Sequence, residues 1–96
     1  MIVALAAGLV VITAIIATFV DIIDWFTHRH TLYFSDADNV AFTLAKHWED
    51  GNYNTVQGVF NTRGKHIVDG RNLHSQNVDQ DLANAHRGKR MAVYTD

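Results

Sequence analysis

Residues 2–20 read IVALAAGLVVITAIIATFV, an uncharged and largely apolar run in which Thr13 and Thr18 are the only polar side chains. A helix rises about 1.5 Å per residue, so a helix of this length spans roughly the 30 Å hydrocarbon core of a bilayer. No basic residue precedes the run and no small-residue cleavage motif closes it, which distinguishes it from a secretory signal peptide. The run therefore predicts an uncleaved N-terminal transmembrane helix.

The predicted helix continues beyond the apolar run, because helical spacing persists as far as His28. We expect residues 1–28 to form the transmembrane helix with an interfacial extension, and residues 29–34 to form a short junction. Aromatic rings and long basic side chains favour the headgroup region of a bilayer. The predicted membrane-interface residues are Trp25, Phe26, Arg29 and Tyr33.

The charges around the run predict its orientation. Only the α-amino group lies before it, whereas His28, Arg29 and His30 follow it closely. Because basic residues are retained on the cytoplasmic side of a span, we expect a single-pass membrane protein whose C-terminal domain lies in the cytoplasm. The lipid bilayer is then the first predicted partner.

Residues 35–96 predict a small α+β domain that begins with a helix. Ser35 followed by Asp36 and Asp38 is typical of a helix start, with a hydroxyl cap and negative charge in the first turn. Apolar residues then recur at three- and four-residue spacing, which extends the helix to about Asp50.

The rest of this domain predicts a hairpin, a second helix and a last strand. Residues 53–61 and 66–74 are rich in residues that favour strands and are joined by a turn that contains Gly64. A second helix is predicted over residues 77–86 and a third strand over residues 91–95. The predicted order is helix, strand, strand, helix, strand, with both helices on one face of a three-stranded sheet.

Length and composition limit the function. The chain has 96 residues, a net charge of −2 and no cysteine, which excludes disulfides and thiolate metal sites. A domain of about sixty residues buries only about 60% of its unfolded surface, so we expect it to depend on a partner. The near balance of charge gives no broad attraction to nucleic acid, and we predict no nucleic-acid partner.

The six histidines raise the question of metal binding or catalysis. Asp21, Asp24 and His28 share one face of the predicted helix, with His30 nearby, and such a set could bridge a divalent ion. A polar stripe also marks the end of a membrane helix, and metal sites need fixed ligands with supporting hydrogen bonds. The chain contains no HExxH, CxxC or GxSxG motif and no Gly-rich phosphate loop after a strand. We therefore predict no catalytic residue, no metal site and no cofactor.

Charged residues supply the predicted partner contacts. The two aspartates at the membrane boundary could pair with basic residues of a neighbouring membrane subunit. Basic residues in the hairpin turn and after the second helix could converge on an acidic partner or on lipid headgroups. The predicted partner-contact residues are Asp21, Asp24, Arg63, Lys65, Arg87, Lys89 and Arg90.

We interpret the chain as a non-catalytic single-pass membrane protein. It would act as an accessory or interaction subunit of a larger membrane assembly, or associate with itself as a homo-oligomer. Small residues along one ridge of the predicted membrane helix favour such association. The alternative is a membrane-tethered, histidine-dependent metal-binding protein or a small enzyme.

Overall fold

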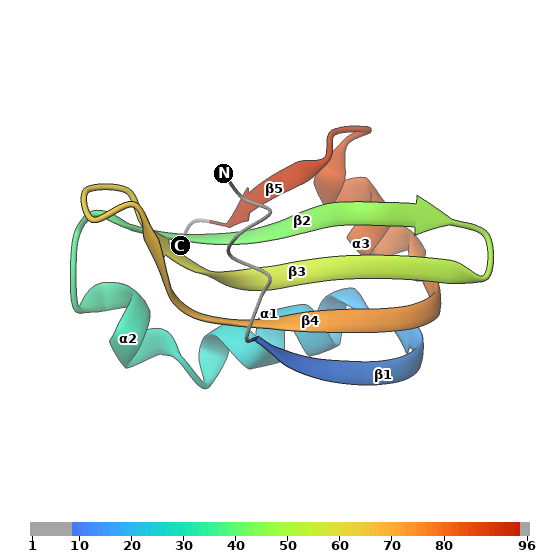
Figure 1. Cartoon of the computed structure of the whole chain (residues 1–96), viewed down its shortest axis with the longest axis horizontal. Helices are drawn as coiled ribbons and strands as arrows, with labels where there is room; N and C mark the ends of the chain where they lie inside the picture. Colours follow the sequence, from blue (N-terminus) through green and yellow to red (C-terminus); the bar gives the residue numbers. More distant parts are fainter. Residues whose placement is uncertain (1–8, 95–96) are drawn as a thin grey trace.

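The computed structural model describes residues 9–94, which form a five-stranded sheet with three short helices (Figure 1). The elements in chain order are β1 (Val10–Ala17), α1 (Phe19–Thr27), α2 (His30–Phe34), β2 (Asn39–Glu49), β3 (Asn52–Asn61), β4 (His66–Val78), α3 (Gln80–His86) and β5 (Met91–Tyr94). The strands lie side by side in the order β1-β4-β3-β2-β5. β1 runs parallel to β4, and all other neighbours are antiparallel. β1 and β5 are therefore the edge strands.

The apolar run near the N-terminus forms a strand where a transmembrane helix was predicted. Residues 10–17 are β1, and the first helix begins only at Phe19, with Thr18 as its N-cap. Valine, isoleucine and threonine favour extended backbone because they branch at Cβ, and β4 supplies hydrogen-bond partners along one side. Residues 2–8 of the predicted span lie outside the described residues.

The prediction of a membrane span is wrong. In the part of the chain that the structure describes, no helix is both long and apolar enough to cross a bilayer. The predicted single-pass membrane location with a cytoplasmic C-terminal domain fails with it. An uncharged run rich in β-branched residues is apolar enough for a membrane span and also favours a strand. In this chain the run forms a strand because it pairs with β4.

The helix predicted over residues 35–50 is also wrong, because these residues form a turn and then the strand β2. The Asp36 carboxylate accepts a hydrogen bond from the Asp38 N–H at 2.9 Å, so the helix-start pattern closes a turn instead. In β2, Thr43 bonds to α3 on one face, whereas Phe42 packs against the Gly58 position on the other. A central strand that buries residues on both faces loses the alternation that identifies a strand.

The remaining predicted elements are present. β3 and β4 form the antiparallel hairpin, and α3 and β5 follow it. The Asp79 carboxylate accepts the Leu82 N–H at 2.8 Å as the N-cap of α3. It also accepts the Phe19 N–H at 3.1 Å, so one side chain holds the starts of α1 and α3 together. The sheet has five strands where three were predicted, because β1 and β2 join it.

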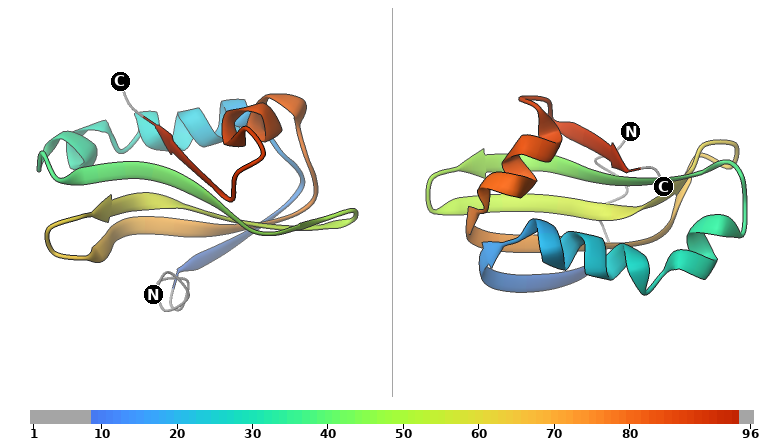
Figure 2. Two further views of the ribbon diagram at one scale, coloured as in Figure 1. Left: turned by 90° about the horizontal axis from the view of Figure 1, so that it is seen from above. Right: turned by 180° about the vertical axis from the view of Figure 1, so that it is seen from behind.

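The core lies between the sheet and the helices. Figure 2 shows all three helices on the same side of the sheet. Between them and the strands lies a buried cluster of Ala17, Ile22, Leu73 and Leu82. Ile22 and Trp25 are the buried residues of α1, which holds this helix on the sheet by one apolar stripe. The two sheet edges and the ends of the strands are left as candidate functional surfaces.

Candidate functional site

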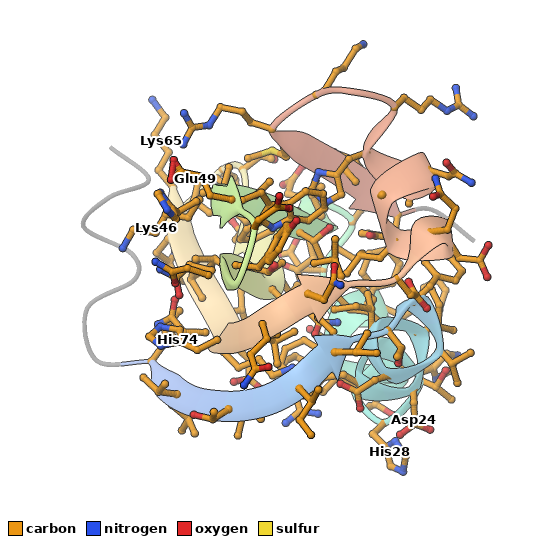
Figure 3. The ribbon with its side chains drawn as sticks, turned by 90° about the vertical axis from the view of Figure 1, so that its right-hand side faces the viewer. Asp24, His28, Lys46, Glu49, Lys65 and His74 are labelled. Atoms are coloured by element: carbon orange, nitrogen blue, oxygen red, sulfur yellow. The ribbon has the colours of Figure 1, made fainter. Side chains whose placement is uncertain are left out.

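β1 is an edge strand whose apolar side chains are exposed. Among the described residues it pairs only with β4, so its outer backbone groups have no strand partner. Figure 3 shows β1 at the margin of the molecule. Five of its large apolar residues are exposed: Val10, Val11, Ile12, Ile15 and Ile16. Natural edge strands are usually blunted by charge, proline or shortness, whereas β1 has eight residues that are neither charged nor proline.

The opposite edge of the sheet is protected. β5 has only four residues, and Arg87, Lys89 and Arg90 lie just before it. Short length and neighbouring positive charge both oppose pairing with a further strand. Of the two edges, β1 is therefore the one suited to accept another strand.

The predicted membrane-interface residues Trp25, Phe26 and Arg29 take part in packing between α1 and the sheet. Trp25 is 7% exposed, and the Arg29 guanidinium lies 3.8 Å from the centre of the Trp25 ring. Arg29 also donates a hydrogen bond to the Asp69 carboxylate at 2.8 Å. The rings of Phe26 and Tyr94 lie 5.2 Å apart between their centres. Internal contacts therefore account for these side chains.

Tyr33 lines a partly open hollow of about 520 Å³ between α1, α2 and the sheet. Its walls are largely aromatic, and Ala41 and Val59 of the sheet also line it. None of the residues of α2 is buried, so this short helix stands over the sheet without filling the space beneath it. The hollow follows from small sheet residues opposite a loosely packed helix.

Asp21, a predicted partner contact, is paired within the molecule through Arg71. Arg71 donates to the Asp21 carboxylate at 2.9 Å and to the side-chain oxygen of Gln57 at 2.8 Å. Gln57 is fully buried and donates to the Ile22 carbonyl at 2.8 Å. These bonds join α1 to β3 and β4. Sequence reasoning missed Arg71 because nothing in its local pattern shows that α1 will cover it.

The four candidate metal ligands are not gathered. Asp21 faces Arg71, and the His30 ring packs against Phe34 with 4.8 Å between ring centres. The Asp24 Oδ2 and the His28 Nδ1 lie 3.5 Å apart, and this exposed pair points away from the sheet (Figure 3). Within residues 9–94, no three side chains of the metal-binding types form a cluster.

His86 is buried, although its sequence context resembles that of an exposed residue at a helix end. Its Nε2 lies 2.9 Å from the Thr43 hydroxyl, and its Nδ1 lies 3.1 Å from the Lys89 carbonyl oxygen. The Thr43 hydroxyl also bonds to the Tyr94 hydroxyl at 2.8 Å. The Trp48 ring packs on the imidazole with 4.6 Å between ring centres. Burial lowers the pKa of His86 and raises that of Tyr94, so the uncharged form of each is favoured.

The predicted basic contacts do not converge into one patch. Arg63 and Lys65 lie in the turn between β3 and β4, and Arg63 pairs with Asp36 at 3.0 Å. The other three follow α3, and Figure 1 shows the two turns at different ends of the molecule. Lys89 and Arg90 line a second, more open hollow of about 520 Å³, which Lys46 of β2 also lines.

The comparisons with known proteins give no relative. No family model matches this chain, and neither a curated protein nor a solved structure shows significant similarity to it. The functional argument therefore depends on the chain's own geometry.

Proposed function

We propose that this protein is a homotypic interaction module, in which two copies join their β1 strands into one continuous sheet. The observation that carries the proposal is the exposed, uncharged edge of β1, with large apolar side chains on both faces. Pairing at such an edge forms backbone hydrogen bonds and removes apolar surface from water in the same step. This proposal keeps the interaction function expected from the sequence and assigns it to β1.

Symmetry restricts the register. A two-fold axis perpendicular to the sheet makes the pairing antiparallel and keeps the helices of both copies on the same side. Opposed residues then share a face, so the axis passes through a residue position. A pairing centred on Thr13 sets Val11 against the partner's Ile15 and Val10 against the partner's Ile16. No charged side chain enters any of these pairs.

This arrangement closes on itself. Pairing β1 with β1 uses the same surface on both copies and leaves the two short β5 edges at the outside. Pairing β1 with β5 of another copy would build an open chain of molecules. The four residues of β5 can satisfy only part of an eight-residue edge, which favours the closed dimer.

The test is the molar mass of the full chain, measured by sedimentation velocity over a range of concentrations. The informative variant is Ile15→Lys, and its matched control is Val20→Lys on α1. Ile15 is 73% exposed and Val20 is 75% exposed, so the two changes add the same charge and remove similar apolar surface. The unchanged chain and Val20→Lys should sediment as dimers and Ile15→Lys as a monomer.

The proposal is wrong if the unchanged chain stays monomeric at the highest concentration reached. It is equally wrong if both lysine variants dissociate to the same extent, since that result would indicate general apolar adhesion. Circular dichroism of each variant verifies that the sheet is intact during the comparison.

A further inference from the structure

One row of residues across the sheet underlies the hollow between α1, α2 and the sheet. Ala41 of β2 pairs with Val59 of β3 and with Tyr94 of β5. Val59 pairs in turn with Asp69 of β4. Paired residues share a face of the sheet, and this row faces the helices, because Asp69 accepts a hydrogen bond from Arg29. The two central residues, Ala41 and Val59, are small and line the hollow. The row therefore leaves space above β2 and β3.

Contacts with α1 hold both ends of this row. At the β4 end, the Arg29 side chain lies 2.8 Å from the Asp69 carboxylate. At the β5 end, the centres of the Tyr94 and Phe26 rings lie 5.2 Å apart. Figure 2 shows α1 and α2 along one side of this face of the sheet and β5 along the other. The hollow is thus bounded by side chains that are packed in place on both sides.

Two separate groups of aromatic rings line the hollow. The first group is Phe26 and Tyr94, from α1 and β5. The second group lies on α2, where the Phe34 ring is 4.9 Å from the Tyr33 ring and 4.8 Å from the His30 ring, between centres. In the part of the chain that the structure describes, no ring contact joins one group to the other. The rings of each group therefore pack on one another but not on those of the other group.

The charge in the hollow is already balanced. Arg29 is the only lysine, arginine, aspartate or glutamate in the described lining. Its partner is Asp69, and its guanidinium also lies 3.8 Å from the centre of the Trp25 ring. An ionised ligand would lose its hydration here without gaining a counter-charge, which is costly. The lining therefore favours a neutral ligand.

The size and the exposure of the lining suit a small molecule. The volume of about 520 Å³ lies within the range typical of small-molecule sites, roughly 300–1,000 Å³, which are lined mainly by apolar and aromatic side chains. Phe34 is 54% exposed and Ile23 is 39% exposed, although both line the hollow. A molecule bound there would remove this apolar surface from water.

From the two separate groups of rings above a row of small residues, we propose that this hollow binds a neutral aromatic molecule. The ligand lies between the two groups and contacts Phe26 and Tyr94 on one side and Phe34 on the other. Ring contacts of this kind stabilise a complex beyond the area that they bury.

The test is a fluorescence titration of the full chain with Nile red, a neutral aromatic dye whose emission increases in apolar surroundings. Ala41→Leu places a larger side chain in the hollow and should raise the dissociation constant at least about tenfold. The matched control is Ala92→Leu. Ala41 and Ala92 are 5% and 6% exposed, and Ala92 shares the helix-facing side through its pairing with Thr43, but it does not line the hollow. Ala92→Leu should leave the dissociation constant unchanged.

A second pair of variants changes only exposed side chains, so the fold is preserved in both. Phe34→Ala removes one ring of the α2 group and should raise the dissociation constant about three- to tenfold. Its control is Val93→Ala, because Val93 is 57% exposed and pairs with Phe42 on the opposite face of the sheet. Val93→Ala should bind the dye as the unchanged chain does.

The proposal is overturned if the emission of Nile red does not change at any protein concentration reached. Equal dissociation constants for Ala41→Leu and Ala92→Leu would place the dye outside the hollow. Equal weakening by Phe34→Ala and Val93→Ala would indicate general apolar adhesion.

The variant Ile15→Lys separates this proposal from the proposed dimer, because no described residue of β1 lines the hollow. Ile15→Lys should bind Nile red with the dissociation constant of the unchanged chain, whatever its oligomeric state. Loss of binding in this variant would assign the dye to the β1 edge and overturn the proposal.

Discussion

The imidazole Nε2 of His86 and the hydroxyl of Thr43 lie 2.9 Å apart, although 43 positions separate them in the chain. This contact joins the last turn of α3 to the centre of β2. The Tyr94 hydroxyl bonds to the same Thr43 oxygen, so a single threonine of β2 contacts both α3 and the neighbouring strand β5. Buried polar groups of this kind are costly to leave without partners, which makes the network a determinant of stability.

Replacing Thr43 by valine should lower the free energy of unfolding by about 2 kcal/mol, because it removes the hydrogen-bond partner of the buried His86 Nε2 and of the Tyr94 hydroxyl. The matched control is Thr31→Val, since Thr31 is exposed on α2 and should change stability by less than about 0.5 kcal/mol. Urea denaturation followed by tryptophan fluorescence measures both. Equal urea midpoints for the two variants would contradict the stabilising role of Thr43.

Acidification should destabilise the fold through His86. Its pKa in the folded state lies below the usual value of 6.5, so the unfolded chain binds the proton more readily. The stabilisation is complete above about pH 6.5 and decreases as the pH falls from there toward the lower pKa of the folded state. The midpoint temperature of thermal unfolding should therefore decrease as the pH is lowered from 7.5 to 5.

The His86→Gln variant isolates this contribution, because glutamine keeps a polar side chain but does not titrate. It should be less stable at pH 7.5 and should lose less stability on acidification than the unchanged chain. The exposed His66 provides the control, and His66→Gln should keep the full pH dependence. If all three chains show the same pH dependence, the buried imidazole does not control it.

Substitutions of Arg71 and Arg63 test how burial changes the contribution of an ion pair to stability. Each arginine pairs with an aspartate at about the same distance, 2.9 and 3.0 Å. The Arg71 side chain is 11% exposed and also satisfies the buried Gln57, whereas that of Arg63 is 74% exposed. Arg71→Met should cost about 2–3 kcal/mol of stability and Arg63→Met less than about 1 kcal/mol. Chemical denaturation measures the difference, and comparable losses would show that exposure does not decide the value of these pairs.

Gly58 should not tolerate a side chain, because a Cβ there would lie 2.8 Å from the Asp69 backbone oxygen. Gly58→Ala must displace β4 and should cost about 2 kcal/mol or more. Gly51 offers a comparison, since it has a φ of 78° with open space around it. Gly51→Ala should cost about 1 kcal/mol through backbone strain alone. A smaller effect at Gly58 than at Gly51 would show that the strands separate easily there.

Parts of the fold were predictable from local signals. The hairpin followed from two runs of residues that favour strands, joined by a short turn that contains Gly64. α3 lies within the helix predicted over residues 77–86, which has acidic residues at its start and basic residues at its end. Both signals act within a few residues of the chain, so no knowledge of distant partners is needed.

The candidate sites were less predictable. Phe26, Arg29 and Tyr33 were identified as membrane-interface residues, but Ala41, which lines the hollow with them, comes from a strand that the sequence predicted to be a helix. The buried state of His86 depends on Thr43 and Trp48, which lie on β2 and are distant from it in the chain.

The sequence by itself determined that the N-terminal run carries no charge, that a turn falls near Gly64, and that a helix lies within residues 77–86. Only the tertiary structure decided that residues 10–17 and 39–49 are strands. Their hydrogen bonds go to β4, β3 and β5, which are distant in the chain, and apolar residues on both faces conceal the two-residue period. The edge that we propose as the dimer interface exists because β4 pairs with one side of β1 and leaves the other side free among the described residues.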